Sequence, residues 1–170
     1  MIQGDITTQD ADAIVNAANS SLMGGGGVDG AIHRAGGPSI MEACRAIGHC
    51  KTGDAVVTTA GLLPAQIVIH AVGPVWAGGK YGEADLLANC YRRSLELTAE
   101  RRLERVAFPS ISTGAYGYPV DQAARVALKA VIDVLVDQQQ IVLVRFVLFD
   151  RRTYDAYTAA LKEILGPKRT

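Results

Sequence analysis

Apolar residues along the chain alternate between short β-rich runs and longer stretches with helical spacing. The β-rich runs predict strands at residues 13–15, 55–58, 67–72, 106–111 and 142–149. Between them, helical spacing predicts helices at residues 28–35, 39–47, 83–102, 121–136 and 154–165. Strands that alternate with helices are typical of a largely parallel or mixed sheet between helical layers. The chain has no linker, internal repeat or low-complexity segment, so we expect a single domain over residues 1–170.

The first residues leave little room for a strand. Only Met1, Ile2 and Gln3 precede the segment 4–7 (GDIT). We therefore expect any opening strand to be short and to lie at an edge of the sheet.

Composition and charge exclude several classes of function. Acidic and basic residues balance at 17 each, so no long-range field attracts nucleic acid or a membrane surface. No apolar run is long enough to cross a bilayer, and the N-terminus lacks the charged-then-apolar order of a signal peptide. The three cysteines lack the spacing of a disulfide framework. We therefore expect a cytoplasmic protein with no membrane partner.

Four successive glycines at 24–27 precede a helix that should begin near Val28. Glycine lets the backbone take positive φ and approach a ligand with no Cβ in the way. The free N–H groups and the positive dipole end of the helix would face the same space, which suits an anion such as a pyrophosphate. A flexible loop that merely precedes a helix is the alternative interpretation, because glycine runs are common in the loops between helices and strands.

The same glycines formally satisfy the dinucleotide pattern G-x-G-x-x-G through Gly25, Gly27 and Gly30. That pattern requires its first glycine directly after a strand and an acid about 20 residues further on. Here the segment 16–23 intervenes, and Asp54 is a poorly placed acid. Hydride transfer is therefore kept as a distant alternative.

Polar side chains flank the glycine loop on both sides. Asp29 and His33 are four residues apart at the start of the helix, so both should point to one face. Asp29 would lie beside whatever the loop holds, and His33 could orient its carboxylate. Asn19 offers an amide donor and acceptor that suit vicinal sugar hydroxyls. The alternatives are a helix-starting acid for Asp29 and a turn residue for Asn19.

A second loop rich in small residues, 110–119 (SISTGAYGYP), follows the strand expected at 106–111 and precedes the helix at Asp121. Tyr116 within this loop could form a wall or lid over a sugar. In open α/β sheets, ligands gather beyond the carboxyl ends of the strands. Both loops follow strands and precede helices, so they should lie on the same edge and form a groove around a diphosphate.

Four segments resemble the macrodomain family, and most closely its MacroD-type branch, whose members bind ADP-ribose. These segments are 4–7 (GDIT), 14–19 (IVNAAN), 24–33 (GGGGVDGAIH) and 112–117 (STGAYG). The resemblance extends to the last helix and so covers nearly the whole chain. It implies an α/β fold, a three-layer α/β/α sandwich with a mixed central sheet. We expect no cofactor and no metal.

The resemblance also implies a role for each residue of the motifs. Asp5 would accept a hydrogen bond from the adenine amino group, Ile6 would contact the adenine ring, and Phe149 would pack against it. Asn19 would hold the distal ribose, and Asp29 would activate or position water. The diphosphate and the ribose next to it would be enclosed by Gly25, Gly26, Gly27, Val28, Ser112, Thr113, Gly114, Ala115 and Tyr116.

Hydrolysis requires catalytic groups in addition to those that bind the ligand. The candidate catalytic residues are Asn19, Asp29 and His33, since relatives that do not hydrolyse often lack an acid at the position of Asp29. Glycoside cleavage ordinarily uses two carboxylates, and the motif supplies one. One base suffices where the leaving group is itself a carboxylate with a pKa of about 4. The expected substrates are therefore proteins with ester-linked mono-ADP-ribose on Glu or Asp, and O-acetyl-ADP-ribose. An N-glycosidic link to arginine would need a general acid that the motif lacks.

Two other functions stay open. The chain could be an ADP-ribose reader that uses the same groove without turnover. It could also regulate through protein or RNA contacts elsewhere on its surface. The arginine pairs at 92–93 and 101–102 fit solvated helix faces, so nucleic acid is not an expected partner.

The remaining candidates favour structural roles. His70 lies inside a predicted strand, which favours a packed core histidine over a catalytic one. Cys44, His49 and Cys50 lack a fourth ligand and the spacing of a zinc site. The loop 73–82, which contains Trp76 and Tyr81, could flank the groove or pack as an ordinary loop.

Overall fold

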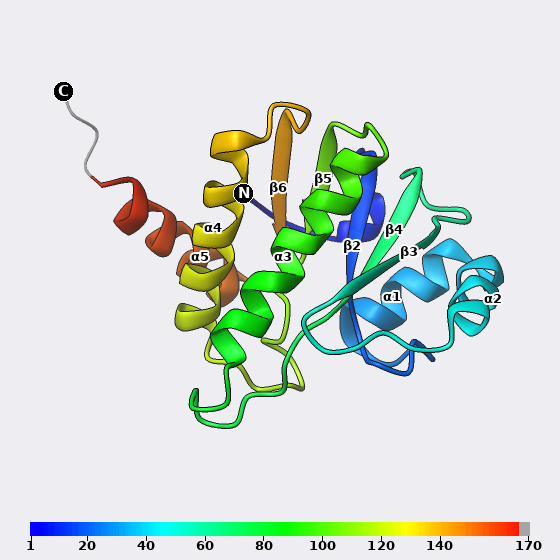
Figure 1. Cartoon of the computed structure of the whole chain (residues 1–170), viewed down its shortest axis with the longest axis horizontal. Helices are drawn as coiled ribbons and strands as arrows, with labels where there is room; N and C mark the ends of the chain where they lie inside the picture. The colour runs from blue at the N-terminus through cyan, green and yellow to red at the C-terminus, as the bar shows by residue number, and fades with distance from the viewer. Residues whose placement is uncertain (167–170) are drawn as a thin grey trace.

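A six-stranded sheet lies between layers of helices in the computed structural model, which describes residues 1–166 (Figure 1). The strands follow the order β1-β6-β5-β2-β4-β3. Among the described strands, β3 and β4 pair antiparallel and all other neighbours run parallel, so the sheet is mixed as expected. The strands are β1 (Ile2–Gln3), β2 (Ala13–Ala18), β3 (Ala55–Thr59), β4 (Ile67–Val72), β5 (Arg105–Phe108) and β6 (Leu143–Leu148).

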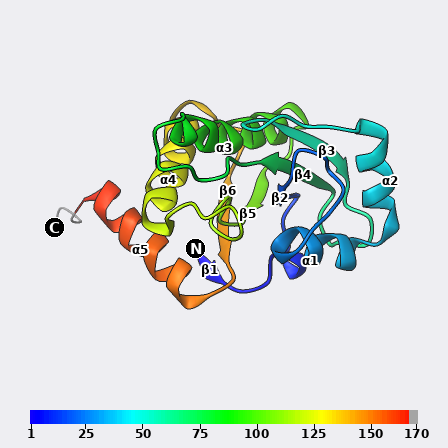
Figure 2. The same cartoon turned by 90° about the horizontal axis from the view of Figure 1, so that it is seen from below.

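Helices cover both faces of this sheet (Figure 2). Helices α3 and α4 pack together over one face, and α5 packs against α4 near the β1 edge. Helices α1 and α2 cover the opposite face. Their bounds are α1 (Gly27–Gly36), α2 (Pro38–Ile47), α3 (Glu83–Glu100), α4 (Val120–Asp137) and α5 (Arg151–Leu165), and a 3-10 turn η1 (Ile6–Thr8) precedes β2. The expected α/β/α sandwich is confirmed.

The central strand β2 sends successive side chains to opposite faces, as a pleated strand requires. Ala13 and Val15 join the apolar cluster beneath α3 and α4, whereas Ile14 and Ala18 join the cluster beneath α1 and α2. The strand runs to Ala18, three residues past its expected end, because it pairs with β4 along that whole length. Asn16 interrupts this apolar run and is completely buried.

The end of β5 and the start of α5 each differ by three residues from the sequence pattern, for local reasons. β5 ends at Phe108 instead of continuing to residue 111, because Pro109 has no N–H to donate to a neighbouring strand. α5 begins at Arg151, three residues earlier than expected. Asp150 caps it by accepting a hydrogen bond from the Thr153 N–H at 2.8 Å.

The opening strand is short and lies at an edge, as expected, since β1 pairs with β6 at the end of the sheet. Residues 167–170 of the expected single domain lie outside the described residues. Within residues 1–166, none of the helices combines the length and apolarity needed to span a membrane.

Candidate functional site

A groove of about 720 Å³ opens beyond the carboxyl ends of β2, β5 and β6. These strands run parallel, so the loops that follow them meet at one edge of the sheet. Asp29 lines the groove, whereas His33 lies behind Asp29. The predicted binding residues also line it: Asp5, Ile6, Asn19, Gly25, Gly26, Gly27, Val28, Ser112, Thr113, Gly114, Ala115, Tyr116 and Phe149. The fold thus brings both loops into one concave site, while the roles of these residues stay predictions.

The glycine loop leaves the start of α1 open to this groove. Helix α1 begins at Gly27, and its N-cap Gly26 has no side chain to satisfy the first N–H groups. A Cβ on either residue would meet no described heavy atom within 4 Å, so a ligand can approach the backbone itself. Gly27 has a φ of 58°, in the left-handed region that favours glycine. The geometry suits an anion at the positive end of the helix dipole.

Asn19 closes the start of the glycine loop. Its Nδ2 donates to the Gly24 carbonyl at 2.8 Å, and its Oδ1 accepts from the Ser21 hydroxyl at 2.7 Å. These are the bonds of a turn asparagine, one of the two interpretations of this residue. The side chain also lines the groove, and Nδ2 has a second hydrogen to offer a ligand.

Asp29 is held from behind by two side chains. Asn16 Nδ2 donates to Asp29 Oδ1 at 2.7 Å, and His33 Nε2 lies 3.3 Å from the same oxygen. The other oxygen, Oδ2, faces the glycine loop, since a Cβ on Gly25 would lie 3.3 Å from it. Asp29 and His33 share one face of α1, as their spacing predicts. One carboxylate oxygen is therefore anchored and the other is turned toward the groove.

His70 is a buried core histidine, as the sequence predicts. Its Nδ1 lies 3.1 Å from Asn16 Nδ2, and its Nε2 lies 2.8 Å from the Thr58 hydroxyl. Burial, together with the nearby His33, lowers the pKa of His70 from 6.5 to about 4, so the ring is neutral at pH 7. The sequence interpretation assigned no role to Asn16, although this residue lies within the motif 14–19 (IVNAAN).

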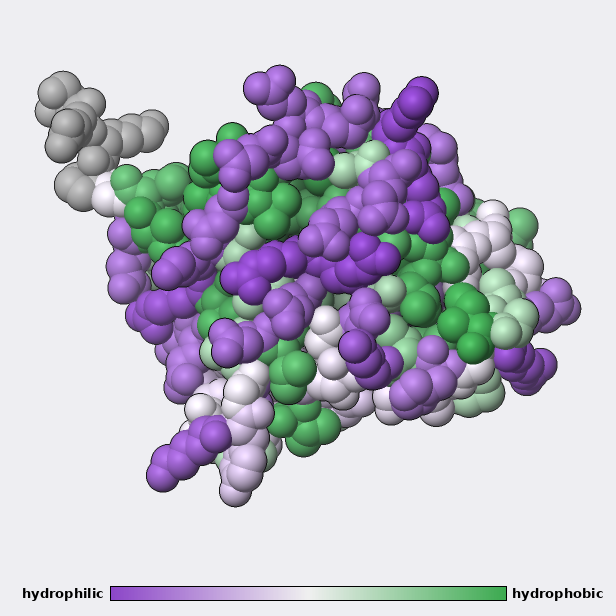
Figure 3. Space-filling view, viewed as in Figure 1, coloured by the Kyte–Doolittle hydropathy of each residue, from purple (hydrophilic) through white to green (hydrophobic). Residues whose placement is uncertain are grey.

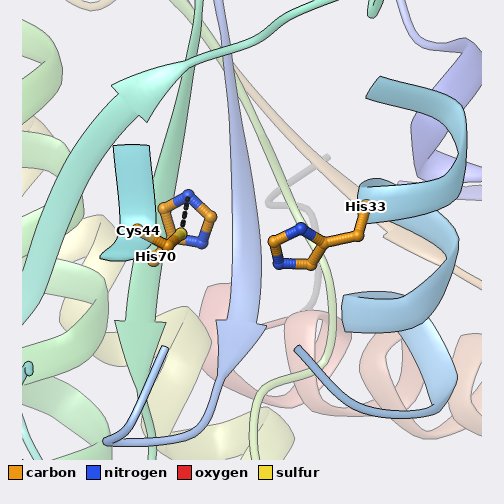
Figure 4. A group of neighbouring side chains, drawn as sticks. All are labelled: His33, Cys44 and His70. Carbon is orange, nitrogen blue, oxygen red and sulfur yellow. Dashed lines mark hydrogen bonds between the residues drawn. The ribbon is translucent and has the colours of Figure 1, made fainter. Parts of the chain in front are cut away.

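Cys44 lies beside His70 rather than with the other cysteines and His49. Figure 4 shows His33, Cys44 and His70 as neighbours, and their ligand atoms all lie within 4.8 Å of one another. Burial, and then the negative charge of Asp29, raises the pKa of the Cys44 thiol. A metal here would need the thiolate and would compete with Thr58 for the Nε2 atom of His70. The hydrogen bonds of the described residues thus account for the His70 ring without a metal.

The second loop, which follows β5, has a strained residue at its centre. Ser112 has a φ of 67°, unusual for a residue with a side chain, and its buried hydroxyl has no hydrogen-bond partner among the described residues. Gly73 makes room for it, because a Cβ on Gly73 would clash with the Ser112 hydroxyl. The Tyr118 N–H donates to the Ser112 carbonyl at 2.9 Å and fixes this turn. The loop backbone is therefore fixed by contacts within the chain.

The loop 73–82 braces the second loop. The backbone N–H of Trp76 donates to the Tyr116 carbonyl at 2.8 Å, and the Trp76 ring packs on Tyr118 with ring centroids 4.6 Å apart. Glu83 anchors the loop by accepting a hydrogen bond from the Tyr81 N–H at 2.7 Å. Tyr81 itself points outward and is 76% exposed. Trp76 thus flanks the groove through its backbone, and Tyr81 does not line it.

The far end of the groove lies where β1 meets β6. The Gly4 N–H donates to the Leu148 carbonyl at 3.0 Å, which brings the neighbouring residues Asp5 and Phe149 together. Asp5 Oδ1 already accepts from the Thr7 N–H at 2.8 Å, and the Phe149 side chain is 83% exposed. An exposed aromatic at the mouth of a groove offers a flat apolar surface to a ligand ring.

Two charged residues that line the groove were not singled out from the sequence. Arg34 lies four residues beyond Gly30 on the groove side of α1, and Asp150 caps α5 beside Phe149. The helical spacing from Gly30 was a usable signal for Arg34. Asp150 gave none, because the pattern placed the start of α5 at residue 154.

Comparison with protein families identifies a match over most of the chain. Residues 15–127 match the family model "Macro domain". A Macro domain-containing protein of Chlorobaculum tepidum is 58% identical, covering 94% of this chain and 93% of the relative. A protein of Salmonella typhimurium named O-acetyl-ADP-ribose deacetylase is 53% identical, covering 96% of this chain and 93% of the relative.

Solved structures agree with this family match. A variant of an Oceanobacillus iheyensis macrodomain, solved with ADPR, has a TM-score of 0.93 and 44% sequence identity. The alignment covers 96% of this chain and 91% of that one. A Trypanosoma brucei macrodomain in complex with ADP-ribose has a TM-score of 0.88 and 38% identity, covering 97% of this chain and 68% of that one.

Proposed function

This chain belongs to the Macro domain family, and from that premise we propose that its groove binds ADP-ribose and that Asp29 positions water to hydrolyse an ester on the distal ribose. The substrates are proteins with mono-ADP-ribose on Glu or Asp, and O-acetyl-ADP-ribose. The observation that carries the proposal is the orientation of Asp29, with Oδ1 anchored and Oδ2 turned to the glycine loop. Relatives named O-acetyl-ADP-ribose deacetylase support it.

The order of groups along the groove suits ADP-ribose. Asp5 and Phe149 stand at the β6 end and can receive an adenine ring. The uncapped N-terminus of α1 lies at the β2 end, where its N–H groups can bind a diphosphate. Asn19 and Asp29 flank Gly25 beside this point, where the distal ribose would lie. Structures of related macrodomains solved with ADPR and with ADP-ribose support ADP-ribose as the ligand.

The number of carboxylates at the reacting end favours an ester. Asp5 and Asp150 belong to the β6 end, so Asp29 is the acid beside the distal ribose among the described lining residues. In a Glu- or Asp-linked substrate, attack of water on the anomeric ribose carbon breaks its bond to the ester oxygen and releases a carboxylate. That carboxylate leaves as an anion and needs no proton from the protein. The proton of the attacking water passes to Asp29 and then to solvent. In O-acetyl-ADP-ribose, water attacks the acetyl carbonyl, the bond to the ribose oxygen breaks, and the proton taken up by Asp29 passes to that oxygen. The substrate phosphates assist by holding the ribose and water in place.

A reader that binds ADP-ribose without turnover is the second candidate function. It is favoured by the hydrogen bonds of Asn19, whose amide already ties Gly24 and Ser21 in the described chain. An asparagine committed to the loop shapes the site for binding and contributes less to chemistry. The two functions use the same groove and differ in what Asp29 does.

Regulation through RNA contact has little support on this surface. A hydrophilic band crosses the face formed by α3 (Figure 3), but it mixes both signs of charge. Arg93 is paired with Glu96 and Glu100, each at 3.1 Å, and with Asp54 at 3.7 Å. Paired arginines on a neutral protein do not make the basic footprint that nucleic acid requires.

Turnover of a defined substrate tests the proposal. The protein is incubated with a protein carrying glutamate-linked mono-ADP-ribose and, separately, with O-acetyl-ADP-ribose, and released products are quantified. We expect Asp29→Ala to lower kcat by about 10²- to 10⁴-fold, because a positioned base contributes that much. The matched control is Asp155→Ala on the exposed face of α5. Wild-type turnover that survives Asp29→Ala contradicts the role of Asp29. Tight ADP-ribose binding by calorimetry with no wild-type turnover would establish the reader.

A further inference from the structure

Buried polar contacts cross the sheet beneath the groove. Asn16 and His70 face one another on the paired strands β2 and β4, with Asn16 Nδ2 3.1 Å from His70 Nδ1. His70 Nε2 lies 2.8 Å from Thr58 Oγ1 on β3, and Asn16 Nδ2 lies 2.7 Å from Asp29 Oδ1 on α1. All four side chains are buried. An unbroken chain of polar groups therefore connects β3 to Asp29.

The hydrogen bonds in this chain of polar groups have a defined donor and acceptor at each step. The Thr58 hydroxyl donates to the Thr59 carbonyl at 3.0 Å, so it accepts from His70 Nε2. A neutral imidazole carries one hydrogen, so His70 Nδ1 must accept from Asn16 Nδ2. The second hydrogen of that amide then points at Asp29 Oδ1. A flipped Asn16 would place its oxygen against the Asp29 carboxylate, so the network assigns the orientation of the amide.

This chain of polar groups lowers the stability of the core that contains it. Asn16 is completely buried, and its Oδ1 has no hydrogen-bond partner among the described residues. An unsatisfied buried acceptor lowers stability, whereas an apolar residue would match its neighbours Val15 and Ala17. Such departures from good core composition concentrate at functional sites. Both amide hydrogens are used and the oxygen is not, which indicates that the donors are what the position requires.

We infer that Asn16 and His70 are positioning residues that hold the Asp29 carboxylate in its working orientation. Asn16 anchors Oδ1, and His70 aims the Asn16 amide from the neighbouring strand β4, on the same face of the sheet. This inference rests on the proposed hydrolysis, because it specifies how Asp29 is kept ready. Neither residue lines the groove, so neither contacts the substrate.

His70 is suited to this task because it stays neutral. Its pKa, lowered to about 4 by burial and by His33, keeps Nδ1 an acceptor throughout the neutral range. His33 approaches from α1 and Cys44 from α2, as Figure 4 shows, and neither replaces the bonds to Asn16 and Thr58. A protonated ring would donate from both nitrogens and would turn its Nδ1 hydrogen against the Asn16 amide.

Two substitutions of His70 separate positioning from packing. His70→Phe keeps an aromatic ring but removes both nitrogens, whereas His70→Gln retains an acceptor for Asn16 and a donor for Thr58. We expect His70→Phe to lower kcat for O-acetyl-ADP-ribose by about 10- to 100-fold, with the Kd for ADP-ribose changed by less than about threefold. His70→Gln should recover most of the lost kcat. Equal losses in the two variants, no loss in His70→Phe, or a Kd that weakens in step with kcat would overturn the inference.

Thr58→Val provides a second variant with a matched control. It removes the hydroxyl that accepts from His70 while keeping the side-chain volume. Thr98→Val makes the same change at a buried threonine of α3 that bonds only to the Ser94 carbonyl in the described chain. Thr58→Val should lower kcat and Thr98→Val should not, with both variants checked for intact folding by their Tm. A kcat loss shared by both variants would contradict the inference.

The tautomer of His70 provides a readout that needs no turnover. Long-range ¹⁵N–¹H spectra of the wild-type protein at pH 7 should show His70 protonated at Nε2 only. Protonation at Nδ1 would overturn the inference even in an active enzyme. If the wild type binds ADP-ribose but does not hydrolyse either ester, the proposed function fails. The tautomer of His70 then shows by itself whether the hydrogen bonds run from His70 through Asn16 to Asp29 as inferred.

Discussion

The backbone N–H of Trp76 donates to the Tyr116 carbonyl at 2.8 Å, so the loop after β4 holds the loop that closes the groove after β5. The two loops are distant in sequence and meet because β2 alone separates β4 from β5 in the sheet. This contact stabilises the shape of the groove, although the Trp76 side chain does not line it.

Removal of the Trp76 ring should therefore weaken ligand binding at a distance. Trp76→Ala loses the packing on Tyr118, and an aromatic pair contributes roughly 0.5–1.5 kcal/mol. We expect the Kd for ADP-ribose, measured by calorimetry, to rise by about threefold to tenfold. Tyr81→Ala in the same loop should leave Kd unchanged, because that side chain is exposed. Equal effects of the two substitutions would show that the ring does not brace the groove.

Gly30→Ala should disrupt the glycine loop although alanine favours helices. A Cβ on Gly30 would lie 2.5 Å from the Gly25 carbonyl oxygen, and that backbone atom cannot move without moving the loop. Overpacking of this kind costs about 1–3 kcal/mol, more than the helix propensity that alanine gains. We expect a lower Tm and weaker ADP-ribose binding. Gly114→Ala adds a Cβ that meets no described atom within 4 Å and caps no helix, so it should keep the wild-type Tm, and a similar loss of Tm there would contradict this explanation.

His70 should make stability fall below neutral pH. Its pKa is about 4 in the folded protein and 6.5 ordinarily, so between these values the unfolded chain binds a proton that the folded protein does not. The stabilisation is complete above pH 6.5 and is lost progressively as the pH falls toward 4. Between pH 7 and pH 5 the free energy of unfolding should fall by about 2 kcal/mol. Urea unfolding at each pH measures this change. The glutamine in His70→Gln cannot titrate. If the stability of that variant depended on pH as the wild type does, the effect could not come from His70.

Asp150→Ala should destabilise α5 through the loss of its cap. The Asp150 carboxylate accepts the Thr153 N–H at 2.8 Å, and such caps contribute about 1 kcal/mol. Thermal unfolding should show a lower Tm, and Asp150→Asn should recover most of it, since asparagine caps helices equally well. Failure of Asp150→Asn to recover the Tm would indicate that charge at the groove, and not capping, is what matters.

Much of the fold and of the candidate site could be predicted from local sequence. Alternating strands and helices predicted an α/β sandwich, because burial on both faces makes apolar strands such as β4 stand out from amphipathic helices. The glycine run and the acid two residues beyond it predicted the open start of α1 and the place of Asp29. These features depend on neighbours within one helical turn, which sequence spacing specifies.

Local sequence did not reveal how Asp29 is oriented. Asn16 is 13 residues before Asp29, and His70 is 54 residues after Asn16, so the contacts among them exist only once β2, β4 and α1 have packed together. Nor did spacing show that Trp76 braces Tyr116, or that Cys44 lies beside His70 instead of joining His49.

The sequence by itself determined most of the residues that line the groove, because the motifs place them in loops at strand ends. The tertiary structure alone decided which oxygen of Asp29 faces the groove, because that choice depends on donors carried by separate strands. A hydrogen bond requires its atoms within about 3 Å and in line, and only the packed sheet brings these atoms to that distance.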